Sequence, residues 1–223
     1  FSEWYLLPMA AAIWSCPTGQ MLDTPLATFV RFCQNHGLLQ VFDRPLWRTV
    51  KGGGREYVRR LAAQLDDIRL ACPVVAVTRE GAGLRVTHAS GGEHFDQVVM
   101  ACHSDQALAI LGLTASDAQR EVLAAIRYQP NRAVLHTDRA LLPRDEKLWS
   151  AWNYAAGSGM PGTQPVAVSY LINRLQRLPF ATPVVVTLNP AREPDPSRVI
   201  AEFEYAHPIF DGPAIAAQQQ LSE

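Results

Sequence analysis

The sequence predicts an α/β fold that becomes α+β in its C-terminal half, and three observations support this prediction. Apolar residues recur at helical spacing through residues 1–65, glycine-punctuated strands follow over residues 72–102, and five strand-like runs lie within residues 128–206. Helices that alternate with strands are typical of layered α/β folds, whereas closely spaced strands favour one antiparallel or mixed sheet. The 223 residues suffice for one large domain or two small ones.

The first 65 residues are expected to form three helices. The stretch SEWYLLPMAAAIW is apolar on most faces, and Pro17 is expected to end this helix. The second helix, LATFVRFCQNHG, is expected to have Pro25 at its first position and Gly37 just beyond its end. Residues 55–65 place tyrosine, valine and leucine side chains on one stripe, which predicts an amphipathic helix.

A β-meander is expected to follow these helices. The stretch CPVVAVTRE predicts its first strand, and closely spaced glycines predict the turns into the next two. Residues 97–102, QVVMAC, form a continuous apolar run, which is typical of a strand buried on both faces. Two further helices are expected, with Ser104 and Ser116 as their N-caps.

From residue 128 onward the pattern becomes strand-like. Proline- and glycine-rich loops separate five runs that are rich in β-branched and aromatic residues: NRAVLHTD, KLWSAWNY, PVAVSYLI, TPVVVTLN and SRVIAEFEY. Because five strands occur within so short a segment, they are expected to form one antiparallel or mixed sheet.

Composition and charge argue against several classes of function. The net charge is −1 and no long basic run occurs, so a surface that neutralises nucleic-acid phosphates is not expected. No apolar run reaches the roughly 18 residues of a membrane span. The four cysteines lack metal-ligand spacing and predict a reduced, cytoplasmic protein: Cys16, Cys33, Cys72 and Cys102.

Two glycine-rich stretches invite comparison with cofactor-binding loops. Gly157–Gly162 has the G-x-G-x-x-G spelling, but a strand rather than a helix follows it, and Pro161 removes a backbone N–H. This stretch is therefore interpreted as a hairpin loop. Gly52–Gly54 does precede a helix, but it lacks the third glycine of a dinucleotide motif and the lysine of a P-loop. It is either a flexible helix start or a turn whose backbone a ligand can approach closely.

The side chains that could carry chemistry give weak signals. Cys102 and His103 lie where a buried strand is expected to meet a helix, which is the usual ligand edge of an α/β sheet. Adjacent strand residues point to opposite faces, so a core cysteine next to a helix-start histidine is favoured over a catalytic pair. The remaining histidines lack metal-ligand spacing, so zinc is not expected. Trp47, Trp152 and Tyr154 are candidates for an apolar substrate pocket, and core packing is the alternative for each.

The order of several segments resembles the flavin-containing amine oxidase superfamily, which includes monoamine oxidases, phytoene desaturases and protoporphyrinogen oxidases. WRTVKGG leads into a helix, and PVVAV, a glycine-turned meander and FDQVVMACH follow in that order. Within the superfamily, LLPMAAAIWSCP, ACHSDQALAIL and AEFEYAHPIFD are similar to a bacterial group of predicted NAD/FAD-binding oxidoreductases. The resemblance spans nearly the whole chain, and its specificity comes from the segments together.

The resemblance implies an incomplete Rossmann-type FAD domain with an inserted mixed-sheet substrate domain. The family's N-terminal G-x-G-x-x-G and its C-terminal glycine-rich segment are absent, and the chain opens on Phe1, so a central fragment of a longer protein is expected. The implied division of the chain is a helical part of the substrate domain at 1–50, the central part of the FAD domain at 51–112, the substrate domain with its mixed sheet at 113–212, and the start of a C-terminal FAD segment at 213–223.

The resemblance also implies which residues contact the cofactor. Val74 matches the family's valine whose backbone contacts the adenine end of FAD, and Val75 lies beside it. Gly52–Gly53 matches the family's Gly-Gly pair, where the backbone passes close to the cofactor, and Ala101 to His103 match the end of the last FAD-domain strand. No catalytic base is assigned, because in this superfamily the flavin carries the hydride chemistry.

Together these implications predict an FAD-dependent oxidoreductase that oxidises an unknown, apolar small molecule by hydride transfer to flavin. A separate piece of this protein is expected to bind FAD poorly. Two alternatives remain open: a non-enzymatic α+β module that binds a ligand or partner through the sheet of residues 128–206, and a hydrolase that uses Cys102 and His103. A fast-alkylating, essential thiol would favour the hydrolase.

Overall fold

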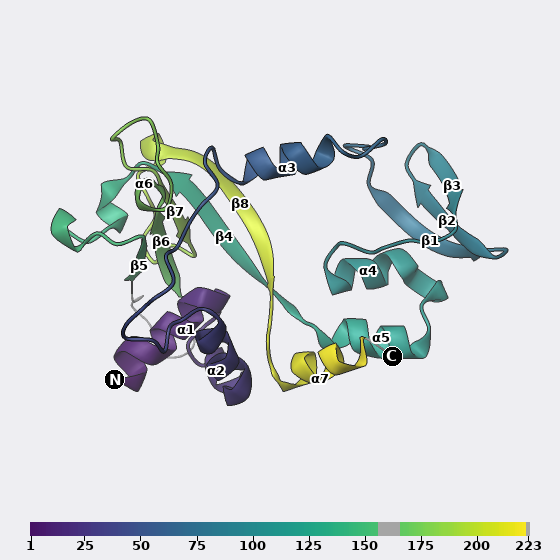
Figure 1. Cartoon of the computed structure of the whole chain (residues 1–223), viewed down its shortest axis with the longest axis horizontal. Coiled ribbons are helices and arrows are strands. Elements are labelled where there is room, and N and C mark those ends of the chain that lie inside the picture. Colours follow the sequence, from purple (N-terminus) through teal and green to yellow (C-terminus); the bar gives the residue numbers. More distant parts are fainter. Residues whose placement is uncertain (156–165, 222–223) are drawn as a thin grey trace. The chain divides into compact units, whose positions relative to one another are not determined.

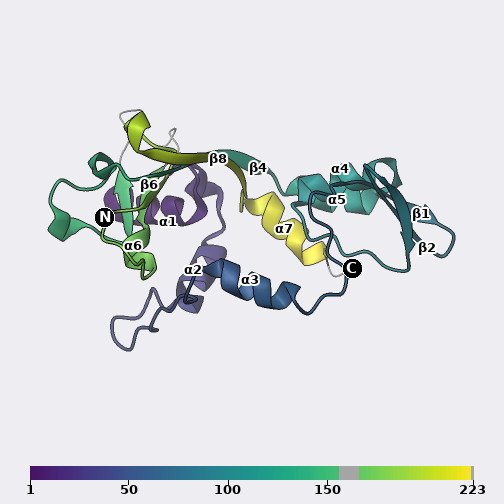
Figure 2. The ribbon, with the colours of Figure 1, turned by 90° about the horizontal axis from the view of Figure 1, so that it is seen from above.

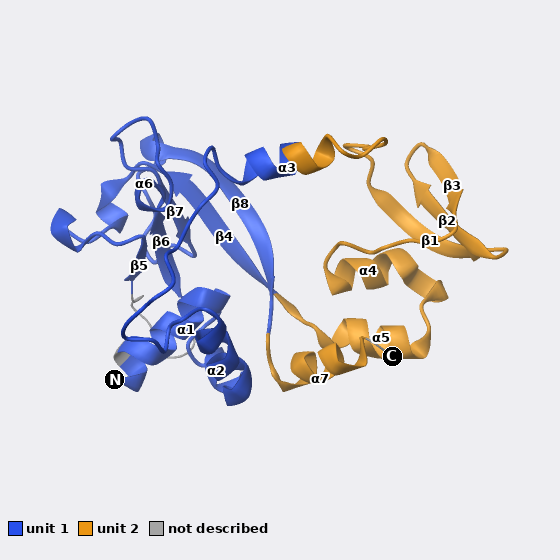
Figure 3. Cartoon of the chain, viewed as in Figure 1, with its two compact units in different colours: residues 1–59, 129–209 blue, residues 60–128, 210–223 orange. Residues whose placement is uncertain are grey.

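The computed structural model describes residues 1–155 and 166–221, and the chain forms two compact units (Figure 3). Unit 1 comprises residues 1–59 and 129–209, and unit 2 comprises residues 60–128 and 210–223. Helix α3, Gly54–Ala62, contains the boundary between them. The assignment of parts of the chain to a substrate domain and an FAD domain stays a prediction.

Unit 1 is built on a five-stranded sheet of order β5-β6-β7-β4-β8 (Figure 1). Its strands are β4 Tyr128–His136, β5 Trp152–Ala155, β6 Ala167–Leu171, β7 Val185–Leu188 and β8 Val199–Pro208. The pairs β5–β6, β6–β7 and β7–β4 are antiparallel. All five strand-like runs of the sequence are confirmed as strands. The first half of KLWSAWNY instead forms a short 3₁₀ turn, because the Asp145 side chain accepts the Lys147 N–H.

Helices cover one side of this sheet. A short π-helix (Ser2–Leu6) leads into α1 (Leu7–Trp14). Helix α2 spans Leu26–Asn35. Ala10 and Ala11 of α1 pack on Val166 and Val168 at β6, and α1 and β6 lie side by side in both views (Figure 1 and Figure 2). Small alanine side chains permit this close approach of helix and sheet. Helix α6, Ile172–Leu175, continues directly from β6.

The helix ends differ slightly from expectation. Helix α1 ends at Trp14, and its C-cap Ser15, two residues before Pro17, has a φ of 52°. Pro25 is the N-cap of α2 rather than its first helical residue, because its ψ of 129° is extended. Gly37 follows α2 with a φ of 64°, as predicted.

Unit 2 combines a three-stranded antiparallel meander with helices. Its strands are β1 Val74–Glu80, β2 Gly83–His88 and β3 Gly91–Phe95, in that order across the sheet. Its remaining helices are α4 Ser104–Leu111, α5 Asp117–Ala125 and α7 Gly212–Gln220. Helix α4 packs against β1, and α5 packs against α7 (Figure 1 and Figure 2). The predicted meander is confirmed.

The buried strand expected over residues 97–102 is not formed. This segment is irregular, and Val99 is 89% exposed. A continuous apolar run becomes a strand only where a neighbouring strand completes its hydrogen bonds, and no described strand pairs with these residues. Helix α3 also ends three residues earlier than the expected Leu65, and its apolar stripe is uncovered.

The two serine caps have different outcomes. Ser116 caps α5 as predicted: its hydroxyl accepts the Gln119 N–H at 3.2 Å, and its own N–H donates to Gln119 Oε1 at 2.9 Å. Ser104 is the first residue of α4 rather than its cap, and His103 takes the N-cap position. The Ser104 N–H instead donates to the Tyr128 hydroxyl at 2.9 Å, which ties the start of α4 to the chain after α5.

Candidate functional site

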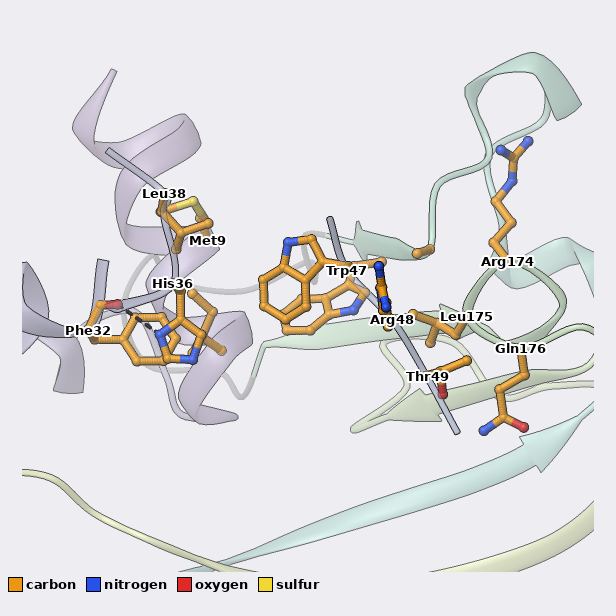
Figure 4. Close-up of a pocket in the computed structure, with 13 residues that line it drawn as sticks. Met9, Phe32, His36, Leu38, Trp47, Arg48, Thr49, Arg174, Leu175 and Gln176 are labelled. Atoms are coloured by element: carbon orange, nitrogen blue, oxygen red, sulfur yellow. Dashed lines mark hydrogen bonds between the residues drawn. The ribbon is translucent and has the colours of Figure 1, made fainter. Parts of the chain in front are cut away.

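A pocket of about 800 Å³ lies wholly within unit 1 (Figure 4). Five segments line it: α1, the end of α2 with the turn after it, the extended stretch at residues 47–49, the start of β5, and the end of α6. This volume falls within the range of roughly 300–1,000 Å³ typical of small-molecule sites. The pocket is therefore a candidate for a substrate site.

Stacked rings form one wall of the pocket. The His36 ring stacks on Phe32 with centroids 4.0 Å apart, and Trp47 lies 6.2 Å from His36 on an almost parallel plane. His36 Nδ1 lies 2.8 Å from the Phe32 carbonyl oxygen, which can only accept, so Nδ1 carries the proton and donates. Nε2 is then the ring nitrogen that remains for a ligand.

Trp152 contributes a further aromatic ring to the pocket lining. It meets Tyr170 edge-on at a centroid distance of 5.3 Å. Its neighbour Asn153 is buried and fixes the start of β5: Asn153 Nδ2 donates to the Ser150 carbonyl at 2.7 Å and to the Ser169 carbonyl at 3.1 Å. Adjacent side chains of a strand point to opposite faces of the sheet. Because the Asn153 side chain is on the buried face, Trp152 lies on the opposite face.

The polar side chains of the pocket are basic or neutral. Arg48 and Thr49 follow Trp47 in the extended stretch, and Arg174 and Gln176 come from α6 and the residue after it. No aspartate or glutamate is among the lining residues that the structure describes. In Figure 4 both arginines lie toward the sheet, on the side opposite Met9, Phe32 and Leu38.

The residues predicted from sequence for the substrate pocket fall in different places. Trp47 and Trp152 both line the pocket. Tyr154 is half-exposed two residues farther along β5 and is not among the lining residues. Their role in substrate binding stays a prediction. The Gly157–Gly162 hairpin interpretation lies outside the described residues.

The residues predicted to contact the cofactor belong to both units. Val74 and Val75 begin β1, which is an edge strand of the meander of unit 2. The β1–β2 register passes from Val74 opposite His88 to Ala76 opposite Thr87, so Val75 is the extra residue of a bulge. A bulged residue on an edge strand has backbone groups outside the ladder, and such groups fit a cofactor that is recognised through the backbone.

The other predicted cofactor residues are a turn and a helix start. Gly52 and Gly53, in unit 1, have φ values of 87° and 85°, which other residues rarely adopt. A Cβ at Gly52 would lie 2.9 Å from Cγ of Glu56, so this turn requires glycine. In unit 2, Ala101 is exposed in the segment before α4, and His103 stacks on Tyr128 at 4.5 Å. The binding roles of these residues stay predictions.

A buried chain of hydrogen bonds crosses the sheet of unit 1. His136 Nδ1 accepts the Asp138 N–H at 3.1 Å, so Nε2 carries the proton and donates to Thr187 Oγ1 at 2.8 Å. Thr187 Oγ1 lies 2.8 Å from Ser169 Oγ. Burial lowers the pKa of His136, while its contacts with Asp138 oppose this shift only in part. The neutral ring is a structural element of the sheet.

Sequence reasoning did not single out Arg48, Arg174, His36, Phe32 or Met9. Each has an ordinary local context, a helix face or a loop, and they come together only through the packing of α1, α2 and α6 around the sheet. One local signal was available: Arg48 directly follows Trp47 in an extended, proline-preceded stretch. An exposed tryptophan beside a cation is a combination that often marks a binding surface.

The described part of the chain lacks both a metal-binding group of side chains and a membrane-spanning helix. It contains no group of three or more histidine, cysteine, aspartate or glutamate side chains placed to hold a metal ion. Within the same residues, every helix is too short or too polar to cross a bilayer.

Comparison with known proteins identifies the family. The family model for flavin containing amine oxidoreductases matches residues 24–177, which confirms the resemblance seen in the sequence. Among curated proteins, none matches. Among solved structures, a "putative protoporphyrinogen oxidase" from Exiguobacterium sp. 255-15 is 14% identical with a TM-score of 0.64, and the match covers 98% of this chain and 55% of that one.

A second solved structure, a CLA-producing fatty acid isomerase from P. acnes, is 16% identical with a TM-score of 0.48, over 70% of this chain and 40% of that one. The chain thus spans about half the length of the solved structures that it matches. The first likeness shows the fold and bears out the predicted α/β class. The family match covers more than half of the sequence. The chain belongs to the flavin-containing amine oxidoreductase family.

Proposed function

We propose that the chain is part of an FAD-dependent oxidoreductase, in which the pocket of unit 1 binds a small organic substrate that loses a hydride to flavin. The family match over residues 24–177 carries this proposal, because members of the family are flavin-containing oxidoreductases. Flavin, when bound, supplies the hydride acceptor. The chain's own residues would bind and orient the substrate and keep water from it.

The pocket suits the substrate part of this task. Its aromatic rings can hold a flat or extended apolar body by ring contact. Such a site needs no protein base at the reacting carbon, which agrees with the absence of an acidic side chain among the lining residues. The work of the protein is then positioning, which can account for a large part of a rate enhancement.

The predicted cofactor contacts form the second part of the proposal. Val74 and Val75 would bind FAD through the backbone groups of the β1 bulge. Gly52–Gly53 would let the cofactor approach a side-chain-free turn, and Ala101 and His103 would lie near it at the start of α4. Because these contacts would be made largely through the backbone, many side chains are compatible with them. The cofactor-binding segments would therefore carry no strict sequence motif.

The domain roles and the cellular setting complete the proposal. Residues 1–50 and 113–212 would form the substrate domain, and residues 51–112 and 213–223 would belong to the FAD domain. The four cysteines are free thiols, which supports a reducing, cytoplasmic setting.

The visible absorbance spectrum of the purified product of the complete gene tests this function. A bound flavin gives absorption bands that bleach on chemical reduction, and we expect both the bands and the bleaching. A folded, colourless protein that takes up no added FAD would contradict the proposal. That result would favour the non-enzymatic binding module instead.

A further inference from the structure

The charge distribution of the pocket differs from what an amine substrate requires. A protonated amine is normally met by a carboxylate or by a fully aromatic cage. Here the lining residues include two arginines, Arg48 and Arg174, and no acidic side chain. A cationic ligand would lie in an apolar-walled site beside two like charges, and both desolvation and repulsion would oppose its binding.

Neither arginine has a partner among the residues that the structure describes. Arg48 and Arg174 form no ion pair there. Some other arginines of unit 1 are paired: Arg132 contacts Glu193 at 2.7 Å and Glu202 at 2.9 Å, and Arg139 pairs with Glu146. The two arginines that line the pocket thus have no acidic partner among the described residues, although other exposed arginines of unit 1 share this property.

Both arginines of the pocket lie on one side of it, together with Thr49, Leu175 and Gln176. Figure 4 shows Arg48 and Arg174 on the side nearer the sheet, and Met9, Phe32 and Leu38 on the opposite side. Trp47 lies between these groups in the same view. A ligand that spans such a pocket needs an apolar body at one end and an anion at the other.

We infer that the pocket of unit 1 binds an amphipathic anion, an apolar chain or ring system that carries a carboxylate or phosphate group. The anionic group contacts Arg48 and Arg174, whose guanidinium forks match the oxygen geometry of both acids. The apolar body lies against Met9, Phe32, Leu38 and Trp47. This inference rests on the proposed function only for calling the ligand a substrate, since the binding preference itself follows from the pocket.

Four dodecyl probes that differ only in their head group test this inference: dodecanoate, dodecyl phosphate, dodecan-1-ol and dodecylammonium. Binding is measured on the purified oxidised protein, below the critical micelle concentrations, by calorimetry and by tryptophan fluorescence. We expect at least one anion to bind about tenfold more tightly than the alcohol, because charge-assisted hydrogen bonds to arginine are added. The ammonium should bind more weakly than the alcohol. The tighter of the two anions identifies the head group.

Variants locate the binding to this pocket. Arg48→Gln and Arg174→Gln should each weaken binding of the tighter anion by about threefold to tenfold, and leave dodecan-1-ol binding unchanged. Arg177→Gln, an exposed arginine three residues from Arg174 that does not line the pocket, should change neither. Circular dichroism confirms that each variant is folded.

Several outcomes would overturn the inference: equal affinity for the ammonium and the anions, anion binding that both arginine variants retain in full, or loss of binding in Arg177→Gln to the same degree. Failure of the proposed function is separate. A protein that binds the anion through Arg48 and Arg174 but carries no flavin would contradict the oxidoreductase and support the ligand class. A flavoprotein that binds none of the four probes would support the oxidoreductase and contradict the ligand class.

Discussion

The sheet of unit 1 and the meander of unit 2 differ in what holds them together. In unit 1, Val168 and Val185 are fully buried, and a hydrogen-bonded chain from Ser169 through Thr187 to His136 lies inside the sheet. In unit 2 the meander has ion pairs on its surface, and Val77 is the one side chain of β1 that is buried. Buried, satisfied polar chains stabilise much more than exposed ion pairs do.

Unit 1 therefore has a packed interior, whereas the meander of unit 2 leaves backbone N–H and C=O groups accessible to a ligand at the β1 bulge. The interior of unit 1 can support a pocket with fixed walls, because α1 and β6 are packed together. The exposed edge and bulge at Val74 and Val75 leave backbone groups accessible in unit 2. Large apolar side chains are exposed in both units, for example Val99 in unit 2 and Phe42 in unit 1, so their exposure does not distinguish the two.

Removing the middle hydroxyl of the buried chain should have the largest effect. Thr187→Val leaves the His136 Nε2–H and the Ser169 hydroxyl without their partner, and each unsatisfied group costs about 1–3 kcal/mol. We expect a loss of about 2–4 kcal/mol in the free energy of unfolding of unit 1. Tryptophan fluorescence in a urea titration measures it, because all five tryptophans of the sequence lie in unit 1.

The matched control is the same change in the meander. Thr78 lies in β1 and is half-buried, and Thr78→Val should alter the stability of unit 2, followed by hydrogen exchange in β1–β3, by no more than about 0.5 kcal/mol. Equal losses in the two variants would contradict the claim that the buried chain stabilises unit 1.

Acid should weaken unit 1 before it weakens the meander. Burial lowers the pKa of His136 below its ordinary value of 6.5, so near that pH the unfolded chain takes up a proton that the folded chain refuses. Stability is complete above pH 6.5 and falls as the pH drops toward the folded-state pKa. Urea titrations followed by tryptophan fluorescence between pH 8 and about pH 5 measure this slope. His136→Gln should remove the slope, and an unchanged slope in that variant would assign it to another group.

Truncating the central ring of the pocket should affect binding and spare stability. Trp47 is 72% exposed in unit 1, so Trp47→Ala should leave the free energy of unfolding almost unchanged. It should weaken binding of dodecanoate or dodecyl phosphate about tenfold, because the ring covers the apolar body. Phe42→Ala removes an equally exposed ring that does not line the pocket, and it should have no effect on binding. An equal loss in both variants would place the ligand elsewhere.

The smallest effect is expected from the surface charges of the meander. Arg69 pairs with Asp67 and Glu93, and hydrogen bonding from Arg69 lowers the pKa of Glu93 below its ordinary 4.5. Stability from this pair is therefore present at neutral pH and lost as the pH falls below 4.5. Arg69→Gln should raise hydrogen exchange in β1–β3 slightly, and about 1 M salt should abolish the difference. A large, salt-independent increase would show that Arg69 stabilises the meander by packing.

Some parts of this structure could be predicted from sequence and others could not, for physical reasons. The runs that became β6 and β7 were predictable because valine-rich strands with nearby partners need only local pattern and short-range pairing. The run at 97–102 has the same composition, but its strand would depend on a partner that the described residues do not provide. Trp47 and Trp152 were suggested by ring type, whereas Arg48 and Arg174 became notable only once the fold had brought them to one pocket.

Hydrogen exchange on the complete gene product, with FAD and with the tighter-binding dodecyl anion added separately, tests the central claim most directly. We predict two footprints. FAD should protect backbone amides at residues 74–76 and at 52–54, and the anion should protect residues 36–38, 47–49 and 174–176. We propose that FAD binds at the β1 bulge and the glycine turn, and that the anion binds in the pocket of unit 1. Protection of the same amides by both ligands would contradict this proposal. So would an absence of FAD protection around Val74.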